Sequence, residues 1–111
     1  MFELSDDAAT YLWLRDACAV IDLKMEYSFS GAIGSGKRLI GCYVPKIEVR
    51  PATNEPDTLF LANQANGVTI YYHPQLRMKT GYRKIFLGLK RLLCWEWLEL
   101  EGAKATPVFD E

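Results

Sequence analysis

Residues 22–29 read "DLKMEYSF", and polar and apolar side chains alternate along the whole stretch. The apolar side chains occupy the odd-numbered positions, Leu23, Met25, Tyr27 and Phe29. Because successive side chains of a β-strand point to opposite faces of its sheet, this alternation predicts a strand with one buried face. The stretch therefore favours a sheet-based fold, and the segments on either side indicate how that sheet continues.

The segment after this strand, "GAIGSGKR" at residues 31–38, fits the phosphate-binding pattern G-x-x-x-x-G-K through Gly31, Gly36 and Lys37. A working phosphate loop continues with a Ser or Thr that meets magnesium, and a helix begins there. Here Arg38 follows the lysine, and the next stretch contains a glycine and a proline and has no helical pattern. We therefore expect a Gly- and Ser-rich connection between two antiparallel strands, and no nucleotide hydrolysis.

Two segments further along the chain also have strand character. "RLIGCYVPKIEVRP" at residues 38–51 predicts a strand that lies at an edge, or carries a bulge, at Pro45, because proline has no backbone N–H to donate. "TLFLANQANGVTIYYHP" at residues 58–74 predicts a hairpin, since Asn66 and Gly67 tolerate the positive φ angles of a tight turn.

A helix is predicted near the start of the chain, in "ELSDDAATYLWLRDACAV" at residues 3–20. Ser5 can cap its first turn, and the two aspartates that follow lie where the helix dipole favours negative charge. Apolar side chains then recur at helical spacing, and Cys18 lies near the expected end of the helix.

The closing segment, "KIFLGLKRLLCWEWLELEG" at residues 84–102, fits a helix or a pair of strands. Trp95 and Trp97 share one parity, whereas Leu98 and Leu100 share the other. Because aromatic and β-branched side chains favour pleated surfaces, we predict two strand segments with an irregular step between them.

The length and composition fit a single domain, residues 1–111, with one hydrophobic core. Hydrophobic residues make up 50% of the chain, so burial can offset the entropy lost on folding. The predicted fold class is α+β, with an N-terminal helix packed on a mostly antiparallel, twisted β-sheet or on paired sheets. The tail at residues 103–111 is expected to be loosely held.

Charge and hydropathy argue against several classes of protein. The formal net charge of −1 indicates no general affinity for nucleic acid or for an anionic membrane. No apolar run approaches the roughly 20 residues that a membrane helix needs. The acidic start of the chain is unlike a secretory signal, so we expect a cytoplasmic protein.

Candidate chemical groups are few. His73 is the single histidine, so a Ser/His/Asp or Cys/His catalytic arrangement would have to use it. It ends a predicted strand beside a proline, an ordinary place for a surface histidine, and we expect no enzymatic activity. Cys18, Cys42 and Cys94 are odd in number and contain no C-x-x-C pair, which argues against a disulfide framework. Their plain interpretation is free, buried thiols, although thiolates could bind zinc, copper or an iron–sulfur cluster if the fold brings them together.

Four stretches follow one another in a suggestive order: "FELSDDAATYL" at 2–12, "IDLKMEYSF" at 21–29, "FLANQANGVTIYYHPQL" at 60–76 and "KIFLGLKRLLCWEWLELEG" at 84–102. In order and pattern they resemble the A-type iron–sulfur carriers, or HesB-like proteins, over roughly residues 2–102. The resemblance implies the fold of that family for this chain, and a link to iron–sulfur cluster biogenesis.

The ligand positions depart from that family, whose members carry a Gly-Cys-x-Gly loop and a C-terminal Cys-Gly-Cys. Here the loop offers "GSG" with Ser35, and the C-terminal "EGAKATPVFDE" has no cysteine. We therefore expect a divergent member that acts as a small non-enzymatic binding or accessory domain. One alternative is an iron or iron–sulfur carrier that uses Cys42 and Cys94, completed by a second subunit. Another alternative is an enzyme of unknown type.

Self-association is also predicted. The change of parity in the closing segment leaves large apolar side chains without an internal partner, and Tyr71 and Tyr72 raise the same difficulty in the hairpin. Closed two-fold dimers are the commonest assembly. We predict a homodimer with Trp95 or Trp97 near the interface. A different protein partner, or a monomer in which the helix and a loop cover both faces, are the alternatives.

Overall fold

The computed structural model describes residues 1–30 and 38–108, so the proposed phosphate loop at 31–37 lies outside the described residues. The elements in chain order are β1 (Phe2–Leu4), α1 (Asp6–Leu14), β2 (Ala17–Ser30), β3 (Arg38–Pro51), β4 (Leu61–Ala65), β5 (Val68–Tyr72), β6 (Arg77–Met78), β7 (Ile85–Leu92), β8 (Trp95–Glu101), β9 (Ala103–Lys104) and β10 (Thr106–Val108). Among the described residues the fold thus has one helix, near the N-terminus, and is otherwise mostly β-sheet, which confirms the predicted α+β class at this level.

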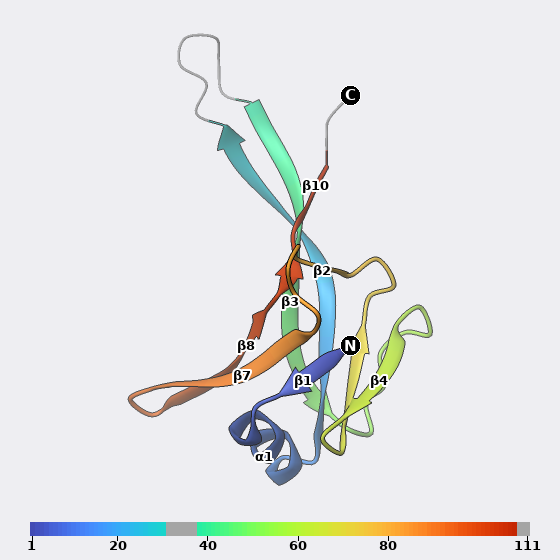
Figure 1. Ribbon diagram of the computed structural model, residues 1–111, viewed down its shortest axis with the longest axis vertical. Helices are drawn as coiled ribbons and strands as arrows, with labels where there is room; N and C mark the ends of the chain where they lie inside the picture. The colour runs from blue at the N-terminus through green and yellow to red at the C-terminus, as the bar shows by residue number, and fades with distance from the viewer. Residues whose placement is uncertain (31–37, 109–111) are drawn as a thin grey trace.

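The largest sheet has five strands in the order β10-β3-β2-β5-β4. β2 and β3 form an antiparallel pair from Ala17 opposite Pro51 to Ser30 opposite Arg38, and Figure 1 shows them as a long, twisted ribbon. The strand predicted from "DLKMEYSF" is therefore confirmed. Pro45 is opposite Leu23 of β2, and β10 pairs with β3 only at residues 41–43. In the described residues no strand therefore pairs with the other side of β3 at Pro45, which agrees with the predicted edge position.

The second sheet has three strands in the order β1-β7-β8. β1 runs parallel to β7, and β7 and β8 form a hairpin that extends to one side of the molecule (Figure 1). The closing segment is therefore two strands, as predicted, and the irregular step is a two-residue turn at Leu93 and Cys94. The predicted hairpin at Asn66 and Gly67 is also confirmed, because β4 and β5 meet there with φ angles of 52° and 75°.

The helix is shorter than predicted. Ser5 caps it as expected, accepting a hydrogen bond from the Ala8 N–H at 3.1 Å. The prediction that it continues to residue 20 is wrong, because Asp16 takes a φ of 49° and the chain enters β2 at Ala17. Cys18 is consequently a strand residue. The small and β-branched side chains that follow fill the sheet interior, and this tertiary burial outweighs local helical spacing.

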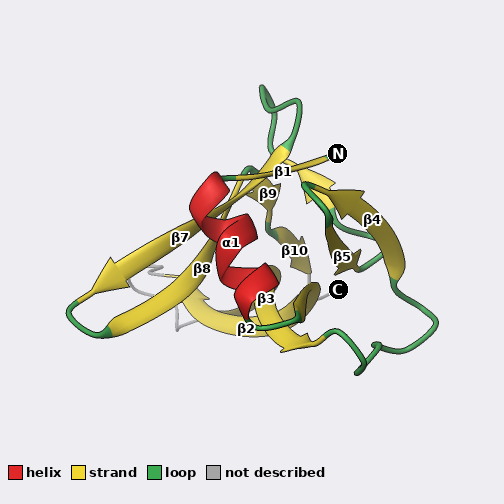
Figure 2. Ribbon diagram, turned by 90° about the horizontal axis from the view of Figure 1, so that it is seen from below, coloured by secondary structure: helices red, strands yellow, loops and turns green. Residues whose placement is uncertain are grey.

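The core lies where α1 meets the two larger sheets. Figure 2 shows α1 between the β7–β8 hairpin on one side and β4 and β5 on the other. The largest fully buried side chains come from the helix and from both sheets: Leu12, Val20, Ile21, Ile70, Ile85 and Leu87.

The third sheet is the short pair of β6 with β9. Both β9 and β10 lie within the tail, residues 103–111, that was expected to be loosely held. In the described residues no helix has both the length and the apolar character needed to cross a bilayer.

Candidate functional site on the open face of the second sheet

The two faces of the β1-β7-β8 sheet differ sharply. Directly opposed residues share a face, so the pairs of Phe2 with Ile85 and Leu4 with Leu87 define an inner face that is buried in the core. The opposite face, called here the open face, is formed by Glu3, Phe86, Gly88, Lys90, Leu92, Trp95, Trp97, Glu99 and Glu101. All of these except Gly88 are exposed. A sheet face that carries three aromatic side chains therefore lies in solvent.

The pairing of β7 with β8 explains the change of parity in the sequence. Leu98 is opposite Leu89 and is buried on the inner face, whereas Trp97 is opposite Lys90 and Trp95 is opposite Leu92 on the open face. The exposed fractions of Trp95 and Trp97 are 69% and 40%. The structure thus brings both predicted interface residues onto one exposed surface.

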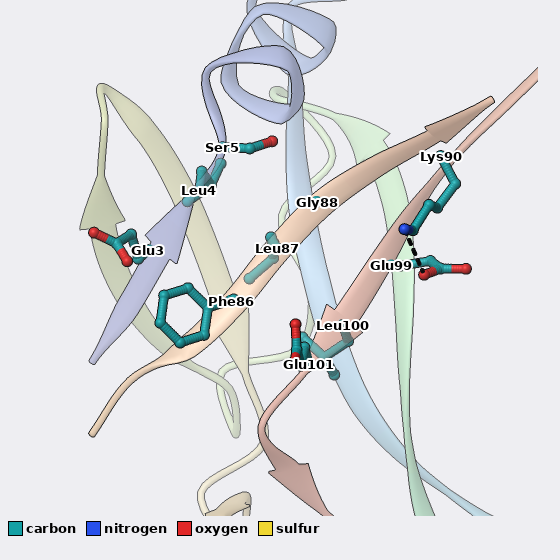
Figure 3. A pocket seen from close by; sticks show the side chains of 10 residues that line it. All are labelled: Glu3, Leu4, Ser5, Phe86, Leu87, Gly88, Lys90, Glu99, Leu100 and Glu101. Carbon is teal, nitrogen blue, oxygen red and sulfur yellow. Dashed lines mark ion pairs between the residues drawn. The ribbon is translucent and has the colours of Figure 1, made fainter. Parts of the chain in front are cut away.

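A hollow lies at the end of the open face nearest β1, and it is called here the Gly88 hollow. It has a volume of about 460 Å³, and the side chains around it include Glu3, Phe86, Lys90 and Glu99 (Figure 3). The hollow exists because Gly88 has no side chain in the middle of the central strand. A Cβ built at Gly88 would meet no atom within 4 Å, so a methyl group fits there without displacing its neighbours.

The charges around the Gly88 hollow are mostly negative: three glutamates surround it, against one lysine. Lys90 Nζ lies 3.9 Å from Glu99 Oε2, and the Trp97 indole donates a hydrogen bond to Glu99 Oε1 at 3.3 Å. The Tyr82 hydroxyl donates to Glu101 Oε1 at 3.2 Å, and this hydrogen bond raises the pKa of Tyr82 above its ordinary value. The hollow therefore offers carboxylate oxygens beside the Phe86 ring.

The three cysteines lie on separate elements. Cys18 is buried in β2, and burial raises the pKa of its thiol above the ordinary value. Cys42 is half-buried in β3, and Cys94 is exposed in the β7–β8 turn, which belongs to the other sheet. Within residues 1–30 and 38–108 no three His, Cys, Asp or Glu side chains gather into a metal site. One chain's described residues therefore do not fit an iron–sulfur cluster, and Cys42 and Cys94 as metal ligands stay a prediction.

His73 has a local structural role. Its Nδ1 accepts a hydrogen bond from the Gln75 N–H at 3.0 Å, and its ring lies edge-on to Phe60 with centroids 6.1 Å apart. These contacts hold the turn that follows β5. They neither test nor support a catalytic role for His73.

Sequence reasoning found the two tryptophans but not the residues of the Gly88 hollow. Phe86, Gly88 and Glu99 share a face only because the turn falls at Leu93 and Cys94, which fixes the register of the hairpin. A two-residue turn assumed at that point would have revealed the grouping. The chain matches no protein-family model, and neither a search of curated proteins nor a search of solved structures finds a match. The resemblance to HesB-like proteins therefore stays a prediction.

Proposed function

We propose that the chain is a small non-enzymatic binding domain that docks a partner protein on the open face, with a basic side chain of the partner in the Gly88 hollow. The observation that carries the proposal is an acidic, aromatic hollow on an exposed sheet face. Burial of apolar surface is the main source of association energy, and exposed apolar side chains that form a contiguous patch mark interaction sites.

The chemistry of the hollow selects the type of side chain. Phe86 offers a ring face for a cation, and the carboxylates of Glu3, Glu99 and Glu101 offer charge-assisted hydrogen bonds. An arginine satisfies both interactions, because its planar guanidinium stacks on a ring and presents several N–H donors. The expected ligand is therefore a polypeptide segment with an arginine beside apolar residues.

Amide chemical shifts of the isotope-labelled protein test the proposal, with the peptides acetyl-Leu-Arg-Leu-amide and acetyl-Leu-Gln-Leu-amide as probes. We expect the arginine peptide to shift the amides of β7 and β8 around Gly88, and the glutamine peptide to have little effect. Gly88→Leu should abolish the response while the fold persists. The pair Glu99→Gln and Glu101→Gln should weaken it, whereas the control pair Glu26→Gln and Glu48→Gln, which removes two exposed carboxylates from the other sheet, should not. Equal responses to both peptides would refute the proposal.

We also propose that the fold is HesB-like, on the order of its elements. A short strand leads into a capped helix, a long strand pair follows, and a hairpin precedes the closing strands. A link to iron–sulfur cluster biogenesis is part of this proposal through the resemblance alone. Binding assays with purified proteins of that process test the link, and an absence of binding to each of them would contradict it.

A further inference from the structure

The far end of the open face carries a second, different surface, called here the tip cluster. It consists of Leu92, Leu93, Trp95 and Trp97 at the end of the β7–β8 hairpin. Their exposed fractions are 63%, 95%, 69% and 40% in that order. Together they expose roughly 550 Å² of largely apolar area, given that an aromatic side chain carries about 150–250 Å². The largest apolar patch of a typical monomer measures about 300–600 Å², so this single cluster reaches the upper end of that range.

Leu93 combines two unfavourable features. It is the first central residue of a two-residue turn and takes a φ of 58°, which residues other than Gly, Asn and Asp rarely adopt. The corresponding turn between β4 and β5 uses Asn66 and Gly67 at its positive φ angles, as turn chemistry favours. Leu93 is also almost fully exposed. A leucine at this position strains the turn and exposes an apolar side chain to water. Burial of Leu93 against another molecule would remove that exposed apolar surface.

The charges beside the tip cluster are balanced within the chain. On the face of the tip cluster, Lys90 Nζ lies 3.9 Å from Glu99 Oε2, in an ion pair that also borders the Gly88 hollow. On the opposite face of the hairpin, Arg91 Nε lies 3.6 Å from Glu96 Oε2. A strongly charged partner therefore finds no net opposite charge at the tip, whereas two identical tips can meet without repulsion. This balance contrasts with the acidic surroundings of the Gly88 hollow, and it favours a second copy as the occupant.

We propose that two copies of the chain associate about a two-fold axis, tip cluster against tip cluster. A standard interface buries about 800 Å² on each partner, of which slightly more than half is apolar. The apolar area of one tip cluster is sufficient for an interface of that size. The tip cluster adjoins the Gly88 hollow, since the Trp97 indole donates a hydrogen bond to Glu99. The two proposals are tested separately, because Gly88→Leu changes only the hollow and Trp95→Lys changes only the tip cluster.

Light scattering and sedimentation at micromolar concentration test the proposal. The wild-type chain should have twice the monomer mass of 12.7 kDa. Trp95→Lys and Leu93→Asp should each weaken association by at least about tenfold, as for central interface residues. Leu59→Lys is the matched control, because Leu59 is 70% exposed outside the tip cluster and its replacement should leave the mass unchanged. Circular dichroism confirms that each variant is folded.

A second measurement locates the contact without changing the tip cluster. Cys94 lies in the same turn, so two tips that meet bring the two Cys94 thiols together. A short bismaleimide should link two chains of the Cys42→Ser variant and should not link the Cys94→Ser variant. A wild-type mass of 12.7 kDa, a dimer that survives both tip substitutions, or links that form through Cys42 instead would each overturn the proposal.

Discussion

Alanine substitutions at three glycines can distinguish the energetic cost of a strained backbone conformation from the cost of close packing. Gly81 and Gly102 have nearly the same φ, 93° and 91°. A Cβ at Gly81 would meet no atom within 4 Å, whereas a Cβ at Gly102 would lie 2.7 Å from Tyr82 Cδ1 and 3.1 Å from the Lys84 carbonyl oxygen. Gly88 also leaves its Cβ position open, and it is not among the positive-φ residues. The three sites thus form a matched series for substitution by alanine.

The expected losses follow from these environments. Gly81→Ala should lower the free energy of unfolding by about 1–3 kcal/mol, the usual cost of a sparsely populated backbone conformation. Gly102→Ala should lower the free energy of unfolding by about 1–3 kcal/mol more than Gly81→Ala does. The additional loss arises because the new methyl group is too close to a backbone carbonyl and to the Tyr82 ring. Gly88→Ala should have no cost and is expected to stabilise the chain by about 0.5 kcal/mol through the unfolded state.

Urea unfolding followed by tryptophan fluorescence measures these differences. All variants must be compared at one protein concentration, since self-association would shift apparent stability. A double-mutant cycle with Tyr82→Ala tests the cause: the extra loss in Gly102→Ala should shrink when the Tyr82 ring is absent. Equal losses for Gly81→Ala and Gly102→Ala would refute the packing argument. A large loss for Gly88→Ala would refute the open environment of the hollow.

Four further predictions concern the turn and the thiols. Leu93→Gly should stabilise the monomer by roughly 1 kcal/mol, because glycine adopts a positive φ without strain, and it should weaken the dimer. Leu93→Ala should weaken the dimer without stabilising the monomer. Urea unfolding measures the stability of each variant, and light scattering measures its mass. Iodoacetamide should modify Cys94 rapidly and Cys18 only on unfolding. Because burial raises the folded-state pKa of Cys18, its contribution to stability should be fully present below about pH 8.5 and fall as the pH rises further, which unfolding curves across that range measure. Anaerobic reconstitution with iron and sulfide should give no stoichiometric visible absorbance; a band that Cys42→Ser removes would support the carrier alternative.

Local patterns predicted the elements whose signals are self-contained. The alternation in residues 22–29 identified β2 because polar and apolar residues alternate at every position. Ser5 identified the start of the helix and Asn66 with Gly67 identified a turn, because each residue type satisfies a specific backbone need. These predictions needed no knowledge of the rest of the chain.

Two features depended on tertiary context and could not be predicted from local pattern. The helix ends at Leu14, because Asp16 adopts a positive φ and residues 17–21 lie in the sheet. The apolar residues among 17–21 are also spaced as in a helix, so the local pattern alone does not show where the helix ends. The Gly88 hollow depends on hairpin register, and register depends on a turn at Leu93 that lacks the usual turn residues. A shift of one residue in that turn would exchange the two faces of β8.

The same register explains why the open face should divide into two sites rather than act as one. Near β1 the face is hollow and is lined by three glutamates and one lysine, whereas at the hairpin tip it is formed by Leu92, Leu93, Trp95 and Trp97. Acidic surroundings attract a basic chain and would repel a second copy, whereas a tip with paired charges neither attracts a basic chain nor repels a second copy. Gly88→Leu should therefore abolish the response to the arginine peptide and leave the mass unchanged, and Trp95→Lys should halve the mass and leave the peptide response intact. If either substitution removed both properties, the whole face would be a single interface, and the division of charge along it would have no functional consequence.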